Sequence, residues 1–392
     1  MTVWTIIHVV DVLLWLIMAA NVFYVLLFAV ASHLPLRHKS PTSHSSPPTF
    51  HSFLVLFPAY HEDTVIKNSV ATFLKQDYPT DLYQVVVISD HMLPETNQWL
   101  AQQPVTLLQP TFEKSSKAKA LQYAIHNSRF TMPDFVIVLD ADNVVGPAFL
   151  SKLSMVVRSD EAIQCHRTAK NADNDIAALD GISEEINNSI FRRGHNRIGM
   201  SSALIGSGMC FSYQWFKDNV EKLDSAVEDR ELEALLMKQG IFVRYAEDIY
   251  VKDEKVSSSD NFQRQRLRWM TGQVQALCRM LPYIPKAVLT GNINYIDKTI
   301  QQALVPRSIL LLIVPLLTIL SLLTSHYSLL IPYLFLLVCL YLAIFLAIPS
   351  QLRTKAIFSK VITLPLLVWK MLKNILHIHP QNKEFIHTTH NQ

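Results

Sequence analysis

Glycine, cysteine and charged residues are all scarce in this sequence of 392 residues. Only nine glycines occur, with no GxGxxG and no Walker A sequence, so any phosphate group has to be bound without a glycine-rich loop. The four cysteines lie far apart with no CxxC pair, which argues against a zinc site and a disulfide framework and fits a reducing compartment. A net charge of +3 is too small for a nucleic-acid-binding protein.

Long apolar runs are abundant instead. Half of the residues are hydrophobic and 17% are charged, whereas about a quarter are charged in a typical soluble domain. Residues 12–31 contain only Asn21 among strongly polar types, and residues 308–324 and 329–349 are separated by a polar turn at 325–328. Because about 20 apolar residues cross the hydrocarbon core of a bilayer as a helix, we predict three membrane-spanning helices, a retained anchor followed by a hairpin.

Basic residues flank these runs on one side only. Positive charge stays on the cytoplasmic side of a membrane protein. The sequence therefore predicts a multi-pass protein of the plasma or inner membrane, with its N-terminus outside and residues 37–307 in the cytoplasm. The flanking basic residues are Arg37, His38, Lys39, Arg307, Arg353 and Lys355.

Between the membrane segments lies a stretch with the composition of a globular domain, residues 50–282. A Ser/Pro linker at 37–49 precedes it. Apolar runs at 53–57, 85–89 and 135–139 alternate with helical patterns at 65–76 and 117–127, which predicts an α/β domain with a mostly parallel sheet. Ligands bind at the carboxyl ends of strands in such sheets, and the acidic residues found there are Glu62, Asp63, Asp90, Asp140 and Asp142.

Two of these acids are one residue apart, at Asp140 and Asp142. They can offer carboxylate ligands to one hard cation, because Mg²⁺ or Mn²⁺ takes one or two carboxylates together with substrate phosphates. A metal would then replace the missing glycine loop. The alternative is that Asp142 or Asn143 caps the following helix.

A second acidic pair, Glu228 and Asp229, begins an amphipathic helix. It serves either as a complement to the helix dipole or as a general base at a cleft.

A third pattern places Gln265, Arg268 and Trp269 on one helix face. An amide, a guanidinium and an indole suit diphosphate pairing and sugar stacking, and the alternative is a basic helix resting on anionic lipid.

Two weaker patterns remain. Gly206 and Gly208 flank Ser207, which indicates either backbone close to a ligand or an ordinary turn. The last residues contain His377, His379, His387 and His390, and a mobile polar tail is a simpler interpretation than a zinc site.

Taken in order, these residues resemble the membrane-embedded family 2 glycosyltransferases, the group of cellulose, chitin, hyaluronan and poly-N-acetylglucosamine synthases. The resemblance covers residues 50–280 and, more loosely, the membrane segments that follow. It implies a GT-A (Rossmann-like) cytosolic domain with transmembrane and interfacial helices at both ends. The motifs that support it are FPAYHED at 57–63, Asp90, KAKAL at 117–121, DAD at 140–142, IGSGM at 205–209, VED at 227–229 and QRLRW at 265–269.

The resemblance also implies a role for each motif. On the donor side, Tyr60, Glu62 and Asp90 would hold the nucleoside, usually uridine. Lys119 would approach the diphosphate, Asp140 would contact the nucleotide and the metal, and Asp142 would bind the metal. His91 stands where a second acid is usual, and Asn143 stands where cellulose synthases have a metal-binding histidine.

On the acceptor side, the resemblance places Gly206 and Ser207 beside the acceptor and makes Asp229 the base, with Glu228 as the next candidate. Arg268 and Gln265 would steady the departing diphosphate, and Trp269 would stack on the acceptor sugar. One displacement would invert the configuration and give a β-linked product from an α-linked donor.

The rest of the chain divides into a first membrane helix at 1–36, an interfacial segment at 283–306, a membrane hairpin at 307–350, an amphipathic helix at 351–380 and a tail at 381–392. In this tail, FIHTTH is similar to the gating loop of the family. The expected partners are a UDP-sugar, a glycan or lipid-linked acceptor and the bilayer, without nucleic acid. Three spans form a thin channel, so a homo-oligomer, a small membrane subunit or single-sugar transfer to a lipid-linked acceptor all stay open beside polysaccharide synthesis. From another class, a degenerate nucleotide-binding membrane sensor is the alternative.

Overall fold

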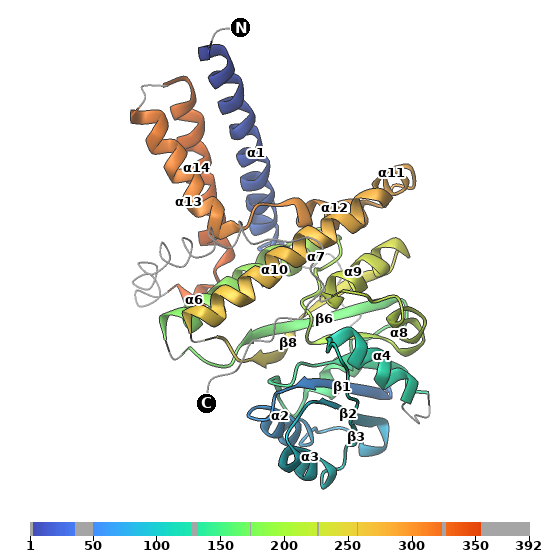
Figure 1. Cartoon of the computed structure of the whole chain (residues 1–392). Helices are drawn as coiled ribbons and strands as arrows, with labels where there is room; N and C mark the ends of the chain where they lie inside the picture. Colours follow the sequence, from blue (N-terminus) through green and yellow to red (C-terminus); the bar gives the residue numbers. More distant parts are fainter. Residues whose placement is uncertain are drawn as a thin grey trace.

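The computed structural model describes residues 3–35, 50–127, 132–172, 174–225, 227–256, 258–323 and 327–353. Three helices, α1 (Val3–Ala31), α13 (Arg307–Leu323) and α14 (Tyr327–Ala347), stand together at one end, and an α/β domain forms the other end (Figure 1). The predicted linker at 37–49, nearly all of the amphipathic helix predicted at 351–380 and the tail at 381–392 lie outside the described residues.

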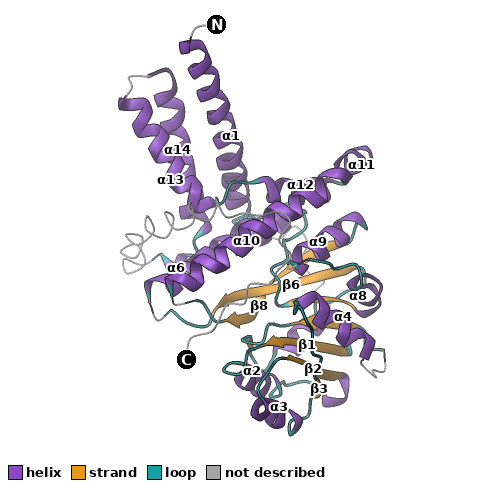
Figure 2. Cartoon of the chain, viewed as in Figure 1, coloured by secondary structure: helices purple, strands orange, loops and turns teal. Residues whose placement is uncertain are grey.

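The domain is built on an eight-stranded sheet in the order β3-β2-β1-β4-β7-β6-β8-β5 (Figure 2). The first four strands in this order pair in parallel, whereas β7 is antiparallel to both β4 and β6. The β6–β8 pair is parallel again, and β5 is antiparallel to β8. The sheet is therefore mixed, and its antiparallel pairs were not predicted. The strands are β1 (Phe53–Tyr60), β2 (Tyr83–Asp90), β3 (Thr106–Leu108), β4 (Phe135–Val138), β5 (Val144–Val145), β6 (Glu161–Ala169), β7 (Met209–Ser212) and β8 (Phe242–Asp253).

Both faces of the sheet are covered by helices. Val85 and Val87 of β2 belong to one apolar core, while Val86 and Ile88 belong to the other, since successive side chains of a strand point to opposite faces. The β1–β2 register places Tyr60 beside Asp90, so the carboxyl ends of these strands meet at one edge. The covering helices are α2 (Ile66–Phe73), α3 (Pro94–Ala101) and α5 (Phe149–Ser154) on one face, and α4 (Lys117–Asn127), α8 (Tyr213–Val220) and α9 (Glu228–Lys238) on the other.

A layer of helices lies between the sheet and the three helices at the other end (Figure 1). The long helix α10 crosses this layer beside α6 and α12. The segment predicted to be interfacial, 283–306, is helical for most of its length. The layer consists of α6 (Asp175–Asn187), the π-helix η2 (Asn188–Gly194), α7 (His195–Arg197), α10 (Ser259–Met280), α11 (Ile284–Leu289) and α12 (Ile293–Ala303).

Two helical segments, Thr5–Ala31 and Leu330–Ala347, are long and apolar enough to cross a membrane. The third predicted span, α13, has 17 residues and qualifies only together with α12, from which it is bent by 61°. The three helices pack through Val22, Leu310 and Tyr333, which are fully buried in one cluster. Two of the three predicted spans are thus confirmed as apolar helices of sufficient length.

A buried polar network fixes α1 to the α/β domain. Tyr24 of α1 donates a hydrogen bond to Asp297 of α12 at 2.6 Å, and the ring of Phe28 stacks on that of His195 at 3.5 Å between centroids. Gly194 is required beneath them, because a Cβ atom there would lie 2.2 Å from the carbonyl oxygen of Phe28. Helix α1 therefore packs directly on the domain, a contact for which the sequence gives no local signal.

Candidate active site

One cavity of about 1060 Å³ extends from the carboxyl ends of the strands to the apolar helices α1, α13 and α14. We call its two parts the sheet end and the membrane end. The sheet end is lined by Tyr60, Glu62, Asp90, Lys117, Asp140, Asp142, Gly206, Glu228 and Asp229, and the membrane end by Asp180, Glu184, Arg192, Arg266, Arg307, Leu311, Tyr341, Ile344, Phe345 and Ile348. Asp63, another acid that follows a strand, is absent from this lining and accepts a hydrogen bond from the Leu93 amide at 2.9 Å.

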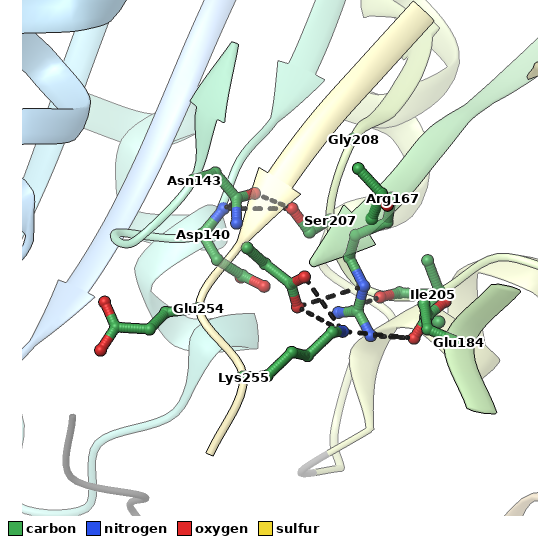
Figure 3. Close-up of polar contacts among 12 residues, drawn as sticks. Asp140, Asn143, Arg167, Glu184, Ile205, Ser207, Gly208, Glu254 and Lys255 are labelled. Carbon is green, nitrogen blue, oxygen red and sulfur yellow. Dashed lines mark hydrogen bonds and ion pairs between the residues drawn. The ribbon is translucent and has the colours of Figure 1, made fainter. Parts of the chain in front are cut away.

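Asp140 and Asp142 lie in a tight turn just after β4. The backbone amide of Asp140 donates to Asn143 Oδ1 at 2.9 Å, and the Ser207 hydroxyl bonds the same oxygen (Figure 3). The two oxygens of Asp142 accept from Asn143 Nδ2 at 3.0 Å and from the Glu254 amide at 2.9 Å. The next helix, α5, begins at Phe149 without a side-chain cap, so the helix-cap alternative for Asp142 and Asn143 is wrong.

This turn fits a divalent cation that shares its ligands with a substrate. The Asp140 side chain is 35% exposed in the cavity, and the Asp142 carboxylate is held in place by its two donors. Among the described residues, no group of three or more His, Cys, Asp or Glu side chains could hold a metal by itself. Two carboxylates completed by phosphate oxygens are a donor set that Mg²⁺ and Mn²⁺ accept.

Lys117, at the start of α4, is the lysine that enters the sheet end. Its ammonium group donates to Asp140 Oδ1 and to the Gly206 carbonyl, both at 2.5 Å, and lies 3.3 Å from Glu228 Oε1. Burial alone would lower the pKa of Lys117, but the charges of Asp140 and Glu228 raise it by more than burial lowers it. The pKa is therefore raised overall, and the amine stays protonated. Lys119 instead donates to the Lys114 carbonyl at 2.6 Å outside the cavity lining, because residues two apart on a helix point in nearly opposite directions.

Glu228 and Asp229 lie in the first turn of α9, beside the loop that contains Gly206, Ser207 and Gly208. Burial raises the pKa of Glu228, although the charge of Lys117 opposes this. Asp229 Oδ1 accepts a hydrogen bond from the Arg230 amide at 2.9 Å. The other carboxylate oxygen, Oδ2, faces Gly206 and would lie 3.7 Å from a Cβ atom added at that position. Gly206 has a φ of 78°, which favours glycine. The Ser207 side chain is fully buried behind this loop.

Helix α10 brings Gln265, Arg268 and Trp269 into the cavity lining together. Burial lowers the pKa of Arg268, while the charges of Glu228 and Asp140 oppose the shift. Within the described part of the chain, the buried Gln265 Oε1 has no hydrogen-bond partner. The neighbouring Arg266 lies over the Trp269 ring at 4.6 Å from its centroid. The predicted helix face is thus turned towards the cavity.

The ends of β1 and β2 bring Tyr60, Glu62 and Asp90 into the same lining. His91 Nδ1 lies 2.5 Å from Asp90 Oδ1, and the Tyr60 and His91 ring centroids are 5.7 Å apart. His91 has a φ of 55°, unusual for a residue with a side chain. Asp90 therefore pairs with His91, the residue at the position where the resemblance led us to expect a second acid.

Sequence reasoning missed a buried ion network behind the Asp140–Asp142 turn (Figure 3). Arg167 Nη2 donates to Glu184 Oε2 at 2.9 Å, and Lys255 Nζ lies 3.0 Å from Asp253 Oδ1. Burial alone would raise the pKa of Glu184, but the charges of Arg167 and Lys255 lower it by more than burial raises it. The carboxylate therefore stays ionised. These residues come from β6, α6 and the end of β8, outside any recognised motif, so only their paired charges could have suggested the network.

Comparisons with known proteins place this geometry in a wider context. Residues 48–272 match the profile of a family described as "Glycosyltransferase like family 2". None of the curated proteins matches the chain.

Solved structures include two similar enzymes. The mannosyltransferase PcManGT from Pyrobaculum calidifontis, in complex with GDP-Man and Mn²⁺, has a TM-score of 0.54 and 14% sequence identity, covering 93% of this chain and 99% of that one. TarS from S. aureus has a TM-score of 0.40 and 16% identity, covering 59% of this chain and 65% of that one. The first likeness shows a shared GT-A-like α/β fold.

Proposed function

The chain belongs to the glycosyltransferase-like family 2, and from this premise we propose that it transfers a sugar from a nucleotide sugar to a glycan acceptor. The observation that supports this most is one cavity lined by Asp140, Asp142, Asp229 and Arg268. A degenerate sensor has no need for a candidate base beside a candidate phosphate site. A metal-dependent transferase needs both.

We propose that the donor binds at the sheet end. Tyr60, Glu62 and Asp90 surround the nucleoside, expected to be uridine, and Asp140 and Asp142 would hold Mg²⁺ or Mn²⁺. Such a cation neutralises the charge on a departing diphosphate. Lys117 is better placed than Lys119 to contact this diphosphate, since its ammonium group already touches Asp140.

The proposed reaction is a single displacement. Asp229 accepts the proton of an acceptor hydroxyl as that oxygen bonds to the anomeric carbon. The bond between this carbon and the diphosphate oxygen breaks, and the electron pair leaves with the diphosphate. Arg268 and Gln265 donate hydrogen bonds to the leaving group. Attack from the opposite face inverts the configuration, so an α-linked donor gives a β-linkage.

The acceptor is proposed to lie against Gly206 and Trp269, with Ser207 supporting the loop from behind. The first candidate product is a cell-surface or extracellular polysaccharide. The second is a lipid-linked glycan extended by one sugar, and the continuation of the cavity to Leu311, Tyr341 and Ile344 favours it. A homo-oligomer or a small membrane subunit would widen the membrane part for polymer export.

We propose that the protein is a multi-pass membrane protein of the plasma or inner membrane with its active site in the cytoplasm, where nucleotide sugars are present. A cysteine introduced between residues 325 and 328 should react with an impermeant maleimide on intact cells. The exposed Glu95 replaced by cysteine should react only after permeabilisation. The reverse pattern contradicts this orientation.

The transfer itself is tested by incubating the purified full-length protein with a panel of UDP- and GDP-sugars, Mn²⁺ or Mg²⁺ and membrane lipid extract. Free nucleotide and product size are measured together. We expect nucleotide release that requires the metal and is abolished by a chelator. No release from any donor contradicts a transferase and favours the sensor alternative.

A further inference from the structure

The membrane end of the cavity differs from the sheet end in its charge. Its ionisable lining comprises the acids Asp180 and Glu184 of α6 and the arginines Arg192, Arg266 and Arg307. Glu184 already pairs with Arg192 at 3.3 Å and with Arg167 at 2.9 Å, and Asp180 pairs with Arg266. Both of these acids are therefore engaged, and among the described residues that define this end the arginines outnumber the acids by three to two.

Two of these arginines lie along one face of α6. Arg266 of α10 pairs with Asp180, while Arg307 of α13 donates to the Ser183 carbonyl at 3.1 Å and to Asn187 Oδ1 at 2.7 Å. Positions 180, 183 and 187 of a helix share one face, within about 10 Å along the axis. The two guanidinium groups are thus neighbours at the start of α13.

Arg307 is only partly exposed, and its recorded hydrogen bonds go to neutral oxygens. Among the residues that the structure describes, it forms no ion pair with a carboxylate, and the buried Nε of Arg266 has no hydrogen-bond partner. A cation held away from water is costly without an anion to pair with it. This arrangement leaves donors available to an anion that enters the cavity.

The surface next to Arg307 is apolar and belongs to the membrane-side helices. Leu311 lies one turn after Arg307 on α13, and Tyr341, Ile344, Phe345 and Ile348 of α14 line the same part of the cavity. A free inorganic anion would gain nothing from these side chains, whereas a hydrocarbon chain would bury apolar area against them.

We propose that the membrane end binds the phosphate and the adjoining hydrocarbon of a lipid-phosphate-linked acceptor, with Arg307 and Arg266 contacting the phosphate. This inference rests on the proposed glycosyl transfer and names the class of its acceptor. Arginine suits the task because its planar fork donates two parallel hydrogen bonds to phosphate. The saccharide attached to such a lipid would extend past Trp269, which contacts Arg266, towards Asp229.

The test measures binding of isoprenyl phosphates to the full-length protein in detergent, without donor. Dimethylallyl, geranyl and farnesyl phosphate vary the chain length, farnesol removes the phosphate, and inorganic phosphate removes the chain. We expect affinity to rise with chain length and farnesol and inorganic phosphate to bind at least about tenfold more weakly than farnesyl phosphate.

Variants identify the site. Arg307→Gln should weaken farnesyl phosphate binding at least about tenfold, and Arg307→Lys should restore part of it, because charge-assisted hydrogen bonds are the strong class. Arg264→Gln is the matched control, since Arg264 is an exposed arginine of the same helix as Arg266 and bonds Asn261. Thermal unfolding of each variant checks that it is folded.

Equal binding by wild type and a folded Arg307→Gln variant overturns the proposal. So does farnesol binding as tightly as farnesyl phosphate, which indicates a plain apolar pocket, or inorganic phosphate competing at the same concentration, which indicates a free-anion site. The proposed transfer is judged separately by metal-dependent nucleotide release, so a protein that releases nucleotide but ignores isoprenyl phosphates contradicts this inference alone.

Discussion

The two ends of the cavity solve different problems with different residues. At the sheet end, carboxylates surround one lysine, and Lys117 contacts both Asp140 and Glu228. At the membrane end, arginines stand beside the apolar side chains of α13 and α14. The first environment suits a diphosphate that arrives with a divalent cation. The second suits an anionic group that carries a hydrocarbon chain and binds without a metal. On the proposed function, one cavity would then hold a water-soluble donor at one end and a membrane-bound acceptor at the other.

The largest effect should come from Asp229, the proposed base at the sheet end. Asp229→Asn keeps the shape of the side chain and removes its basicity, and general-base assistance is worth roughly 10²–10⁴-fold in rate. We expect sugar transfer to fall by that factor, while donor affinity stays within a few-fold of wild type. A transfer assay beside donor titration checks this. Near wild-type transfer by the variant makes Glu228 the next candidate.

A stability measurement probes the contact between α1 and the domain, which contains the buried His195. Burial lowers the pKa of His195 to about 4, with the charge of Lys298 adding to the shift. The unfolded chain takes up a proton below a pH of about 6.5, but the folded chain does not until a pH of about 4.

The contribution of His195 to the free energy of unfolding should therefore be fully present above a pH of about 6.5. It should decrease by on the order of 3 kcal/mol as the pH falls to about 4. Thermal unfolding at a series of pH values measures the slope. The His195→Asn variant should be less stable throughout and show a flatter slope. An unchanged slope in this variant contradicts the account of His195.

The two lysines of KAKAL sharpen the description of the sheet end. Lys117→Met should weaken donor binding by about 10–100-fold, because a hydrogen bond to a charged group is worth roughly 1.5–3 kcal/mol. Lys119→Met is the matched control and should change it less than about twofold, since the Lys119 side chain is exposed and bonds the Lys114 carbonyl outside the cavity lining. Calorimetric titration with the donor nucleotide separates them. The opposite ranking restores the role first expected for Lys119.

The smallest effect concerns the boundary between the ends. Trp269→Ala should raise the acceptor KM by up to about tenfold, because one aromatic contact is worth roughly 0.5–1.5 kcal/mol. Donor affinity should stay unchanged. Loss of nucleotide binding in a folded variant moves Trp269 to the donor site.

The strand-end acids of the sheet end could be predicted because they follow their strands directly. Asp90 ends β2, and Asp140 comes two residues after β4, so a local pattern of apolar strand and acid suffices. The membrane end could not be predicted in this way. Asp180, Arg266 and Arg307 come from three helices that meet only in the folded chain, and no spacing in the sequence relates them.

The lysine shows where local patterns lose precision. The motif KAKAL identifies the right turn of helix, but the choice between its two lysines depends on the exact start of α4 at Lys117. Likewise, the fully buried Ser207 hydroxyl bonds Asn143 instead of lining the cavity. The motif residues were recognisable from the sequence, whereas the direction of each side chain required the fold.

The claim that the Asp140–Asp142 turn holds the donor through a metal is tested most directly by calorimetry. The nucleoside diphosphate identified by the donor panel is titrated with Mn²⁺ into wild type, Asp142→Ala and Asp229→Asn. We expect metal-dependent binding to be lost in Asp142→Ala and retained in Asp229→Asn. Metal-dependent binding that persists in a folded Asp142→Ala variant would contradict the account and place the metal elsewhere.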